Sequence, residues 1–538
     1  MDIIKPILIL TAILVLLATL SQRIKISYPV LLVIGGIVIG SMPNLPLIKL
    51  APDVAFLIFL PPLLYEASWK ISWSDLKAYR KPISWLAIGL VFLTTTVIAA
   101  VAHWFIPGFG WPLAFVLGAI VSPPDAVAAT STLKGLGLPR RLTIILEGES
   151  LINDASALIA YKYAVTAVTS SSFVIWEAGF DFLLVAAGGI VVGLAIGFSF
   201  VVVLKHIKGN ASIETSINLM VPFVSYIIAE RLHVSGVLAV VTTGLYASSK
   251  SSDLFTSQGR LLSNSFWEVA GFFLNGFVFI LIGLQLPVLL TKIPKEALFS
   301  LTAYGILISL SVMLIRMIWL FILAYSPFNA GLLAEDQKPS KRELFVVGWA
   351  GMRGVVSLAT AVAMPFTLLN NQEFPMRRTI IFITFVVILF TLIVQGLTLP
   401  YFIRKLNLKR EPDHESSYEQ ALRLYLTRNS ISFIEDDHFM QTEHLDEDIK
   451  QHLKQRIQHL SEVPIKQTPV NQEDLAEELK KENLKRYLSS ELELVSYQKN
   501  QINRLLQEER FPEKIIRKLE NEMDIWTVAL QSRMESIR

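Results

Sequence analysis

The sequence contains no cysteine, and only 17% of its 538 residues are charged. Without cysteine, disulfide bonds, thiolate catalysis and cysteine-ligated metals are excluded. The eight histidines show no metal-ligand spacing, and no cofactor is expected. Hydrophobic residues make up 53% of the chain and the mean hydropathy is +0.51. A soluble domain of this length does not need that balance, so the sequence predicts an all-α polytopic membrane protein.

Charge is divided unevenly along the chain. Up to Arg410, Lys and Arg exceed Asp and Glu by 11, whereas from Glu411 onward the acids are in excess by 8. We therefore expect a transmembrane domain over 1–410 and a cytoplasmic helical tail over 411–538, interrupted near 462–471. The acidic tail has no basic and aromatic groove, which argues against binding to nucleic acid.

Apolar segments long enough to cross a bilayer recur through the first 405 residues. The first lacks a convincing cleavage site and is expected to be a retained helix. Thirteen spans are predicted, at 3–20, 29–48, 50–68, 83–105, 112–133, 140–168, 178–204, 213–231, 234–249, 261–290, 297–325, 342–369 and 377–405.

The connecting loops differ in positive charge. Loops that follow odd-numbered spans hold 20 Lys and Arg residues, whereas the opposite side holds 7. Because cytoplasmic loops carry the excess of Lys and Arg, we expect the N-terminus outside and the C-terminus in the cytoplasm. The predicted location is a bacterial inner membrane, with the lipid bilayer as a partner.

Two of the predicted spans are interrupted. Pro123 and Pro124 break the fifth span, and Gly351 and Gly354 lie within the twelfth. Backbone groups freed at membrane depth are tolerated only against protein or water. The breaks lie seven spans apart, so they should point in opposite directions. Paired interruptions in inverted halves indicate the binding site of a secondary transporter.

The sixth span carries charges that a bilayer tolerates poorly. Asp154 is expected near the middle of the membrane, where a carboxylate usually acts on ions or protons. Ser150 shares its helix face at a spacing of four, while Glu149 and Asn153 share a face about 100° away. One face of this helix could bind an ion, while the other face packs against the rest of the protein.

Oxygen atoms around Asp154 could form a small cage for a hard monovalent cation. Candidate ligands are the side chains of Asn153, Ser150 and Asp125 and the backbone carbonyl of Pro124. Asp154, Asp125 and Ser150 form the predicted sodium site. Because burial disfavours the charged form of a carboxyl group, Asp154 could exchange a proton for the cation. The competing interpretation is a polar cluster that only joins helices.

Further charged residues within the spans have predicted structural or path roles. Glu149 and Arg353 are expected to form an internal ion pair, because an orphaned charge is costly in a low dielectric. Arg316 and Lys162 are expected to neutralise a helix end or a neighbouring acid. Glu66, near the cytoplasmic end of the third span, could line the cytoplasmic ion path or reach to the interface.

In combination, these motifs closely resemble the monovalent cation/proton antiporter-1 family, which includes NhaP-type sodium/proton antiporters and sodium/proton exchangers. The resemblance covers roughly residues 1–405. It is carried by three stretches in order, which are Ser122-Pro123-Pro124-Asp125-Ala126-Val127-Ala128, Glu147-Gly148-Glu149-Ser150-Leu151-Ile152-Asn153-Asp154 and Gly351-Met352-Arg353-Gly354.

The resemblance implies a thirteen-helix inverted-repeat fold, a homodimer and alternating access by an elevator-like movement. It implies that Asp154 is the shared cation and proton carboxylate, and that Asn153 belongs to the pair typical of electroneutral one-for-one exchange. By the same pattern, Glu66 matches an acid near the cytoplasmic ion path, and Glu149 with Arg353 a structural pair. Pro124 stands where many relatives have threonine, which leaves only its backbone carbonyl as a ligand.

The sequence thus predicts an electroneutral sodium/proton antiporter, with lithium or potassium as other candidate cations. An intramembrane aspartyl protease using Asp125 and Asp154 would need a Gly-x-Gly-Asp setting that is absent. A cation channel or a transport-fold sensor controlled by the tail stays open as an alternative. A channel would not need proton coupling, and a sensor would survive the loss of Asp154.

Overall fold

The computed structural model describes most of the chain. The residues it describes are 4–24, 27–42, 52–125, 129–130, 139–170, 175–207, 209–291, 293–325, 339–368, 372–406, 414–435, 447–462, 481–508 and 510–537. The predicted domain boundary at Arg410 and the predicted tail interruption near 462–471 lie outside them. These residues form two compact units. One is Met1–Phe200, Leu219–Ser248 and Trp267–Arg410, and the other is Val201–Asn218, Ser249–Phe266 and Glu411–Arg538.

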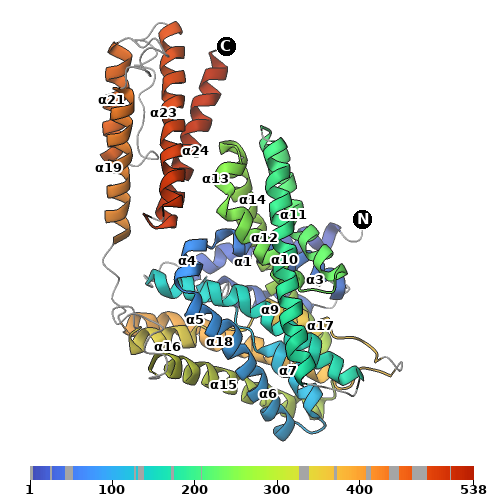
Figure 1. Ribbon diagram of the computed structural model, residues 1–538. Coiled ribbons are helices and arrows are strands. Elements are labelled where there is room, and N and C mark those ends of the chain that lie inside the picture. The colour runs from blue at the N-terminus through green and yellow to red at the C-terminus, as the bar shows by residue number, and fades with distance from the viewer. Residues whose placement is uncertain are drawn as a thin grey trace. The chain divides into compact units, whose positions relative to one another are not determined.

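The described structure is helical (Figure 1). The helices up to the second break are α1 (Ile4–Ile24), α2 (Tyr28–Gly40), α3 (Pro52–Lys70), α4 (Trp73–Ala78), α5 (Arg80–Ser84), the π-helical turn η1 (Trp85–Leu90), α6 (Val91–Phe105), α7 (Trp111–Val121), α9 (Arg140–Ser170), α10 (Ile175–Ile207), α11 (Ala211–Arg231), α12 (Gly236–Ser249), α13 (Ser251–Leu254), α14 (Ser257–Leu290), α15 (Lys295–Tyr325) and α16 (Lys341–Trp349). After the break follow α17 (Val355–Val362), α18 (Arg377–Leu406), α19 (His414–Ile434), α21 (Glu447–Glu462), α23 (Lys481–Gln507) and α24 (Glu513–Ser536).

Each of the thirteen predicted apolar segments overlaps a described helix, and the twelfth overlaps a broken pair of helices; the end of the second segment and most of the second half of the fifth lie outside the described residues. Among the described residues, seven helices contain a stretch long and apolar enough to cross a membrane. Helix α9 is 31 residues long but is not one of the seven. Its apolar runs are diluted by the charged residues that the sequence singles out as a candidate site. The chain is therefore an all-helical protein with several membrane spans.

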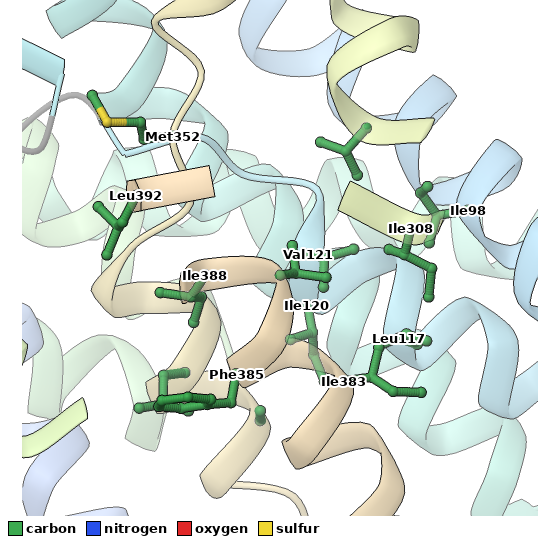
Figure 2. Packing of buried hydrophobic residues seen from close by; sticks show 14 of the residues in the cluster. Ile98, Leu117, Ile120, Val121, Ile308, Met352, Ile383, Phe385, Ile388 and Leu392 are labelled. Carbon is green, nitrogen blue, oxygen red and sulfur yellow. The ribbon is translucent and has the colours of Figure 1, made fainter. Parts of the chain in front are cut away.

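The core of the first unit surrounds the end of α7. Figure 2 shows Leu117, Ile120 and Val121 of α7 among Ile383, Phe385, Ile388 and Leu392 of α18. Met352, from the second break, belongs to the same cluster. This packing holds the end of α7 against α18. The first break therefore starts from a closely packed apolar cluster.

The tail helices have a hydrophobic core of their own. Helices α19, α21, α23 and α24, orange to red in Figure 1, pack against one another. Leu488 and Val495 lie seven residues apart on α23, and both are buried with Ile516 and Trp526 of α24. The tail therefore folds as a helical bundle.

Candidate functional site

The two predicted breaks meet. Helix α7 ends at Val121, and the backbone from Ser122 to Asp125 is not helical. Helix α16 ends at Trp349, and α17 begins at Val355. The amide of Asp125 donates a hydrogen bond of 2.7 Å to the carbonyl of Met352. Each break thus supplies a hydrogen-bond partner for a backbone group that the other leaves outside a helix. Backbone groups in a membrane interior need such partners.

The glycines of the second break make room for charged side chains. A Cβ atom at Gly354 would overlap the carboxylate of Asp125, and one at Gly351 would overlap the side chain of Arg316. Only glycine permits so close an approach of the backbone at these positions. The spacing of Gly351 and Gly354 therefore reflects two side chains that press on the break from different elements.

Helix α9 presents Asn153 and Asp154 beside the first break. The Asn153 side-chain amide donates a 3.1 Å hydrogen bond to the carbonyl of Pro124, and its Oδ1 atom is buried without a hydrogen-bond partner in the described structure. Asp154 is 8% exposed. Within the described residues its carboxylate makes no hydrogen bond and no ion pair, although it lies near enough to Asp125 for the two charges to interact. A buried carboxylate without a counter-charge favours binding of a proton or a cation.

The other predicted ligands belong to the same helix and to the same break. Ser150 is one turn before Asp154 on α9 and is partly buried. The Pro124 carbonyl already accepts the bond from Asn153, but a carbonyl oxygen has a second lone pair. Hydroxyl, carbonyl and carboxylate oxygens are the kind of donor that hard cations prefer.

Glu66 lies in the described structure as a buried acid on α3. Its carboxylate pairs with Lys70, one turn further along, whose side chain is exposed. A methyl group at Gly271 of α14 would lie 2.8 Å from Oε1 of Glu66, so α14 packs directly on this side chain. Glu66 is therefore held between its own helix and α14 rather than free at the surface.

Tyr28 is a residue that sequence reasoning missed. Its charge environment includes both Asp125 and Glu66, so the ring lies within electrostatic reach of the two acids. It packs against Phe272 and Phe279 of α14, with ring centroids 6.4 and 6.5 Å away. A tyrosine at the start of a predicted span carries no signal of this kind, because only the packing of α2 on α14 brings it there.

Glu149 has a different partner from the one predicted. Arg316 of α15 binds both carboxylate oxygens of Glu149, with Nη2 at 2.8 Å from Oε2, and both side chains are 1% exposed. The predicted pair of Glu149 with Arg353 is corrected accordingly. Arg316 neutralises a neighbouring acid, as expected, because its fork-shaped guanidinium matches a carboxylate in two places.

Arg353 lies beside this pair. The charges of Arg316 and Glu149 both act on it, and its backbone amide donates to Thr391 at 3.1 Å. Its Nε and Nη1 atoms are buried and have no hydrogen-bond partner among the described residues. The second break therefore holds a buried positive charge that is only partly compensated.

Two further ion pairs brace α9. At its start, Arg141 binds Glu343 at 2.7 Å, and Glu343 also closes the capping box with Ser340 at the beginning of α16. Further along, Lys162 binds Glu230 of α11 at 3.1 Å, which confirms its expected role. The helix that carries the candidate site is thus fixed to its neighbours on both sides of that site.

A protein-family profile described as "Sodium/hydrogen exchanger, transmembrane" matches residues 9–405. The chain belongs to the sodium/hydrogen exchanger family. This is a family of secondary antiporters rather than enzymes, and its profile spans the two breaks and α9 but not the tail.

Curated relatives agree with the exchanger assignment. The chain is 34% identical over 445 residues to a "Sodium, potassium, lithium and rubidium/H(+) antiporter" of Bacillus pumilus, covering 80% of this chain and 66% of that protein. A protein of the same name from Bacillus subtilis is 32% identical, covering 74% and 61%. The chain therefore spans less than two thirds of the length of these two. The "Na(+)/H(+) antiporter ApNhaP" of Aphanothece halophytica is 34% identical, with 75% of each chain covered.

A solved structure shows the exchanger fold. The sodium proton antiporter MjNhaP1 from Methanocaldococcus jannaschii superimposes with a TM-score of 0.59 and 22% sequence identity. The likeness covers 76% of this chain and 99% of that one. The chain therefore has the fold of a multi-pass exchanger.

Proposed function

We propose that this chain exchanges Na⁺ for H⁺ across the membrane, with Li⁺ and K⁺ as further candidate cations. The observation that carries the proposal is the buried carboxylate of Asp154, which has no counter-charge among the described residues and lies on the helix that contacts the first of two breaks that meet. In this proposal Asp154 binds either the cation or the proton. Asp125, Ser150 and the carbonyl of Pro124 supply the remaining oxygen ligands. Glu66 lies on the cytoplasmic path to the site.

We propose one-for-one, electroneutral exchange. Five ionisable side chains surround the crossing of the breaks in the described structure, namely Asp125, Glu149, Asp154, Arg316 and Arg353. With all five ionised their charges add to minus one. One cation or one proton brings the sum to zero. Because a net charge is expensive in a low-dielectric interior, the two loaded forms are the ones that can cross the membrane.

Asn153 has a positioning role in this proposal. Its bond to the Pro124 carbonyl ties α9 to the first break. Because the amide is neutral, it adds no charge next to Asp154. An aspartate there would bring the site a further negative charge, and the balance between one cation and one proton would be lost.

The remaining expectations belong to the same proposal. They are a transmembrane domain over 1–410 with thirteen spans in inverted repeats, a cytoplasmic tail over 411–538, an N-terminus outside, alternating access and a homodimer in a bacterial inner membrane. Support comes from the described helix that overlaps each predicted segment and from the surplus of Lys and Arg in alternate loops.

The proposal is tested in proteoliposomes that contain a pH dye. Addition of Na⁺, Li⁺ or K⁺ to the wild type should change the internal pH, and Asp154→Asn should reduce the signal to that of empty vesicles. Asp181→Asn, which removes an exposed carboxylate from α10, is the matched control and should behave as the wild type. A wild type that moves no protons with any cation, or an Asp154→Asn variant that equals it, overturns the proposal.

The cation ranking in this assay decides between sodium and potassium. The printed names of the Bacillus relatives include both ions, which keeps K⁺/H⁺ exchange as the second candidate. Currents far above antiport turnover, without proton coupling, would instead indicate a channel.

A further inference from the structure

The second compact unit joins the tail to residues of five earlier helices. It contains Val201–Asn218 and Ser249–Phe266 together with the tail from Glu411 onward. The end of α10, the beginning of α11, the last residue of α12, the whole of α13 and the first ten residues of α14 thus belong with the acidic tail bundle. The family profile ends at residue 405, so the tail lies outside the part of the chain that the family explains.

Arg260, in the first turn of α14, is the centre of a buried ion cluster. Its Nε and Nη2 atoms bind both oxygens of Asp524 of α24, at 2.5 and 2.8 Å. Its Nη1 atom lies 3.0 Å from Glu520, one turn earlier on the same tail helix. Asp524 is fully buried and Arg260 is 7% exposed, so water does little to screen these charges.

Lys499 extends the cluster to a second tail helix. Its ammonium lies 2.9 Å from Asp524 and donates hydrogen bonds of 2.6 Å to Ser257 of α14 and to Thr527 of α24. Both α23 and α24 are therefore tied to the first turn of α14.

The beginning of α14 is also held by α11. Glu214 of α11 is buried and accepts hydrogen bonds from the amide and the hydroxyl of Thr256, at 3.0 and 2.9 Å. Glu214 thus satisfies a backbone donor at a helix N-terminus, which also favours negative charge. With Glu214 bound to Thr256 and Asp524 bound to Arg260, the first turn of α14 has little freedom.

The same helix continues to a residue of the proposed ion path. Gly271 lies eleven residues after Arg260, which is about 16 Å along a helix that rises 1.5 Å per residue. At Gly271 the backbone of α14 packs on the carboxylate of Glu66. A shift or rotation of α14 at its beginning would therefore move the surface against which Glu66 rests.

We propose that the tail anchors α14 through the Arg260, Asp524 and Lys499 cluster and thereby positions Glu66 for ion access. Arg260 and Asp524 are positioning residues, because they act through α14 and touch no ion. This inference rests on the proposed exchange and adds a role for the tail. A tail that packs only on itself would need no buried charges facing α14.

The test compares full-length variants for transport and for tail exchange in the same vesicles. Arg260→Gln and Asp524→Asn should raise the apparent KM for the cation several-fold and leave the maximal rate within about twofold. Both should increase amide hydrogen exchange in 517–530. Arg260→Lys, which keeps the charge but loses the two-pronged bond, should fall between them and the wild type. The matched control is Arg504→Gln, which removes an exposed tail arginine from an i,i+4 pair and should change neither readout.

A cross-link provides a rescue that a general loss of stability would not show. The chain has no cysteine, so Ser257→Cys and Thr527→Cys introduce the only two thiols. Both hydroxyls contact the same Lys499 ammonium, so a short bifunctional thiol reagent can span them. Joining them in the Asp524→Asn background should restore the low KM.

The outcomes separate this inference from the proposed function. An inactive wild type overturns the proposed function. If the wild type exchanges ions, two results for Asp524→Asn overturn the anchoring role. One is an unchanged KM although hydrogen exchange in 517–530 increases, and the other is unchanged hydrogen exchange in 517–530. Loss of maximal rate at unaltered KM, or a cross-link without rescue, also contradicts it. If Arg260→Gln fails to insert into the membrane, Asp524→Asn and the cross-link test the inference without it. Asp524 and Thr527 lie in the tail, and Ser257 is the first residue of α14, before the proposed span at 261–290.

Discussion

The ion cluster between the tail and α14 and the candidate site on α9 use similar side chains in opposite ways. Arg260 and Lys499 each bind Asp524 at 2.9 Å or less, so the buried charges of that cluster are matched at hydrogen-bond distance. At the candidate site Asp154 has no partner in the described structure, and Arg353 has two unbonded donors. Matched buried charges hold elements together. An unmatched carboxylate, such as that of Asp154, is a place where a proton or a cation can bind.

The largest expected effect comes from closing the contact between the breaks. Gly354→Ala would place a methyl group on the Asp125 side chain, from its carboxylate to its Cβ atom, so this side chain would have to leave its position. We expect antiport to fall by more than about tenfold, because small displacements of reacting groups are costly. The measurement is cation-driven proton flux. Gly179→Ala, which meets no atom within 4 Å, is the control and should keep wild-type flux.

The next effect is on stability. Glu149→Gln leaves Arg316 buried without its counter-charge, which should cost about 3–5 kcal/mol of unfolding free energy. Lys162→Gln breaks the exposed pair with Glu230 and should cost about 0–1 kcal/mol. Thermal unfolding of both variants in detergent, against the wild type, measures the difference. Equal losses in the two variants would show that burial does not set the strength of these pairs.

The smallest effect is a pH dependence of the tail anchor. Burial alone would raise the pKa of Asp524, but the hydrogen bonds and charges of Arg260 and Lys499 outweigh it and hold that pKa below its usual 3.8. Glu520, on the same face of α24, faces the same guanidinium. A lowered pKa means that the stabilisation is complete above the pKa of the unfolded chain and is lost as the pH falls through the folded value.

We therefore expect the anchor to persist from neutral pH down to about pH 4 and to weaken only below it. Hydrogen exchange of 517–530 at stepped pH provides the measurement, with Asp524→Asn as a variant that should lose the acid step. Glu491, whose pKa burial raises against the opposing charge of Arg456, is the internal contrast, because Glu491→Gln should leave that step in place. Release of the anchor between pH 6 and pH 7 would be inconsistent with a lowered pKa at Asp524.

Much of the fold could be predicted from the sequence, because local chemistry sets it. The adjacent Pro123 and Pro124 cannot continue a helix, and Gly351 and Gly354 mark a second break; both interruptions are present in the structure. Their direct contact, through Asp125 and Met352, depends on tertiary packing that local sequence does not encode.

The partners of buried charges were harder to predict. Glu149 could have paired with either of two arginines in later spans, and helical spacing within α9 does not distinguish them. The sequence places Arg260 in a loop between two predicted spans. In the structure it lies in the first turn of α14 and binds a tail residue 264 positions away. Only the fold shows which charges lie together.

The most direct test of one-for-one exchange is a balance of gradients in proteoliposomes at controlled voltage. A sodium gradient is opposed by a proton gradient of the same ratio, and the internal pH is followed while a gradient of a membrane-permeant anion such as thiocyanate, without K⁺, sets the membrane potential. The charge sum around Asp154 predicts no net flux at this balance, whatever the potential. A balance point that moves with voltage would contradict it, because unequal numbers of charges would then cross in each direction.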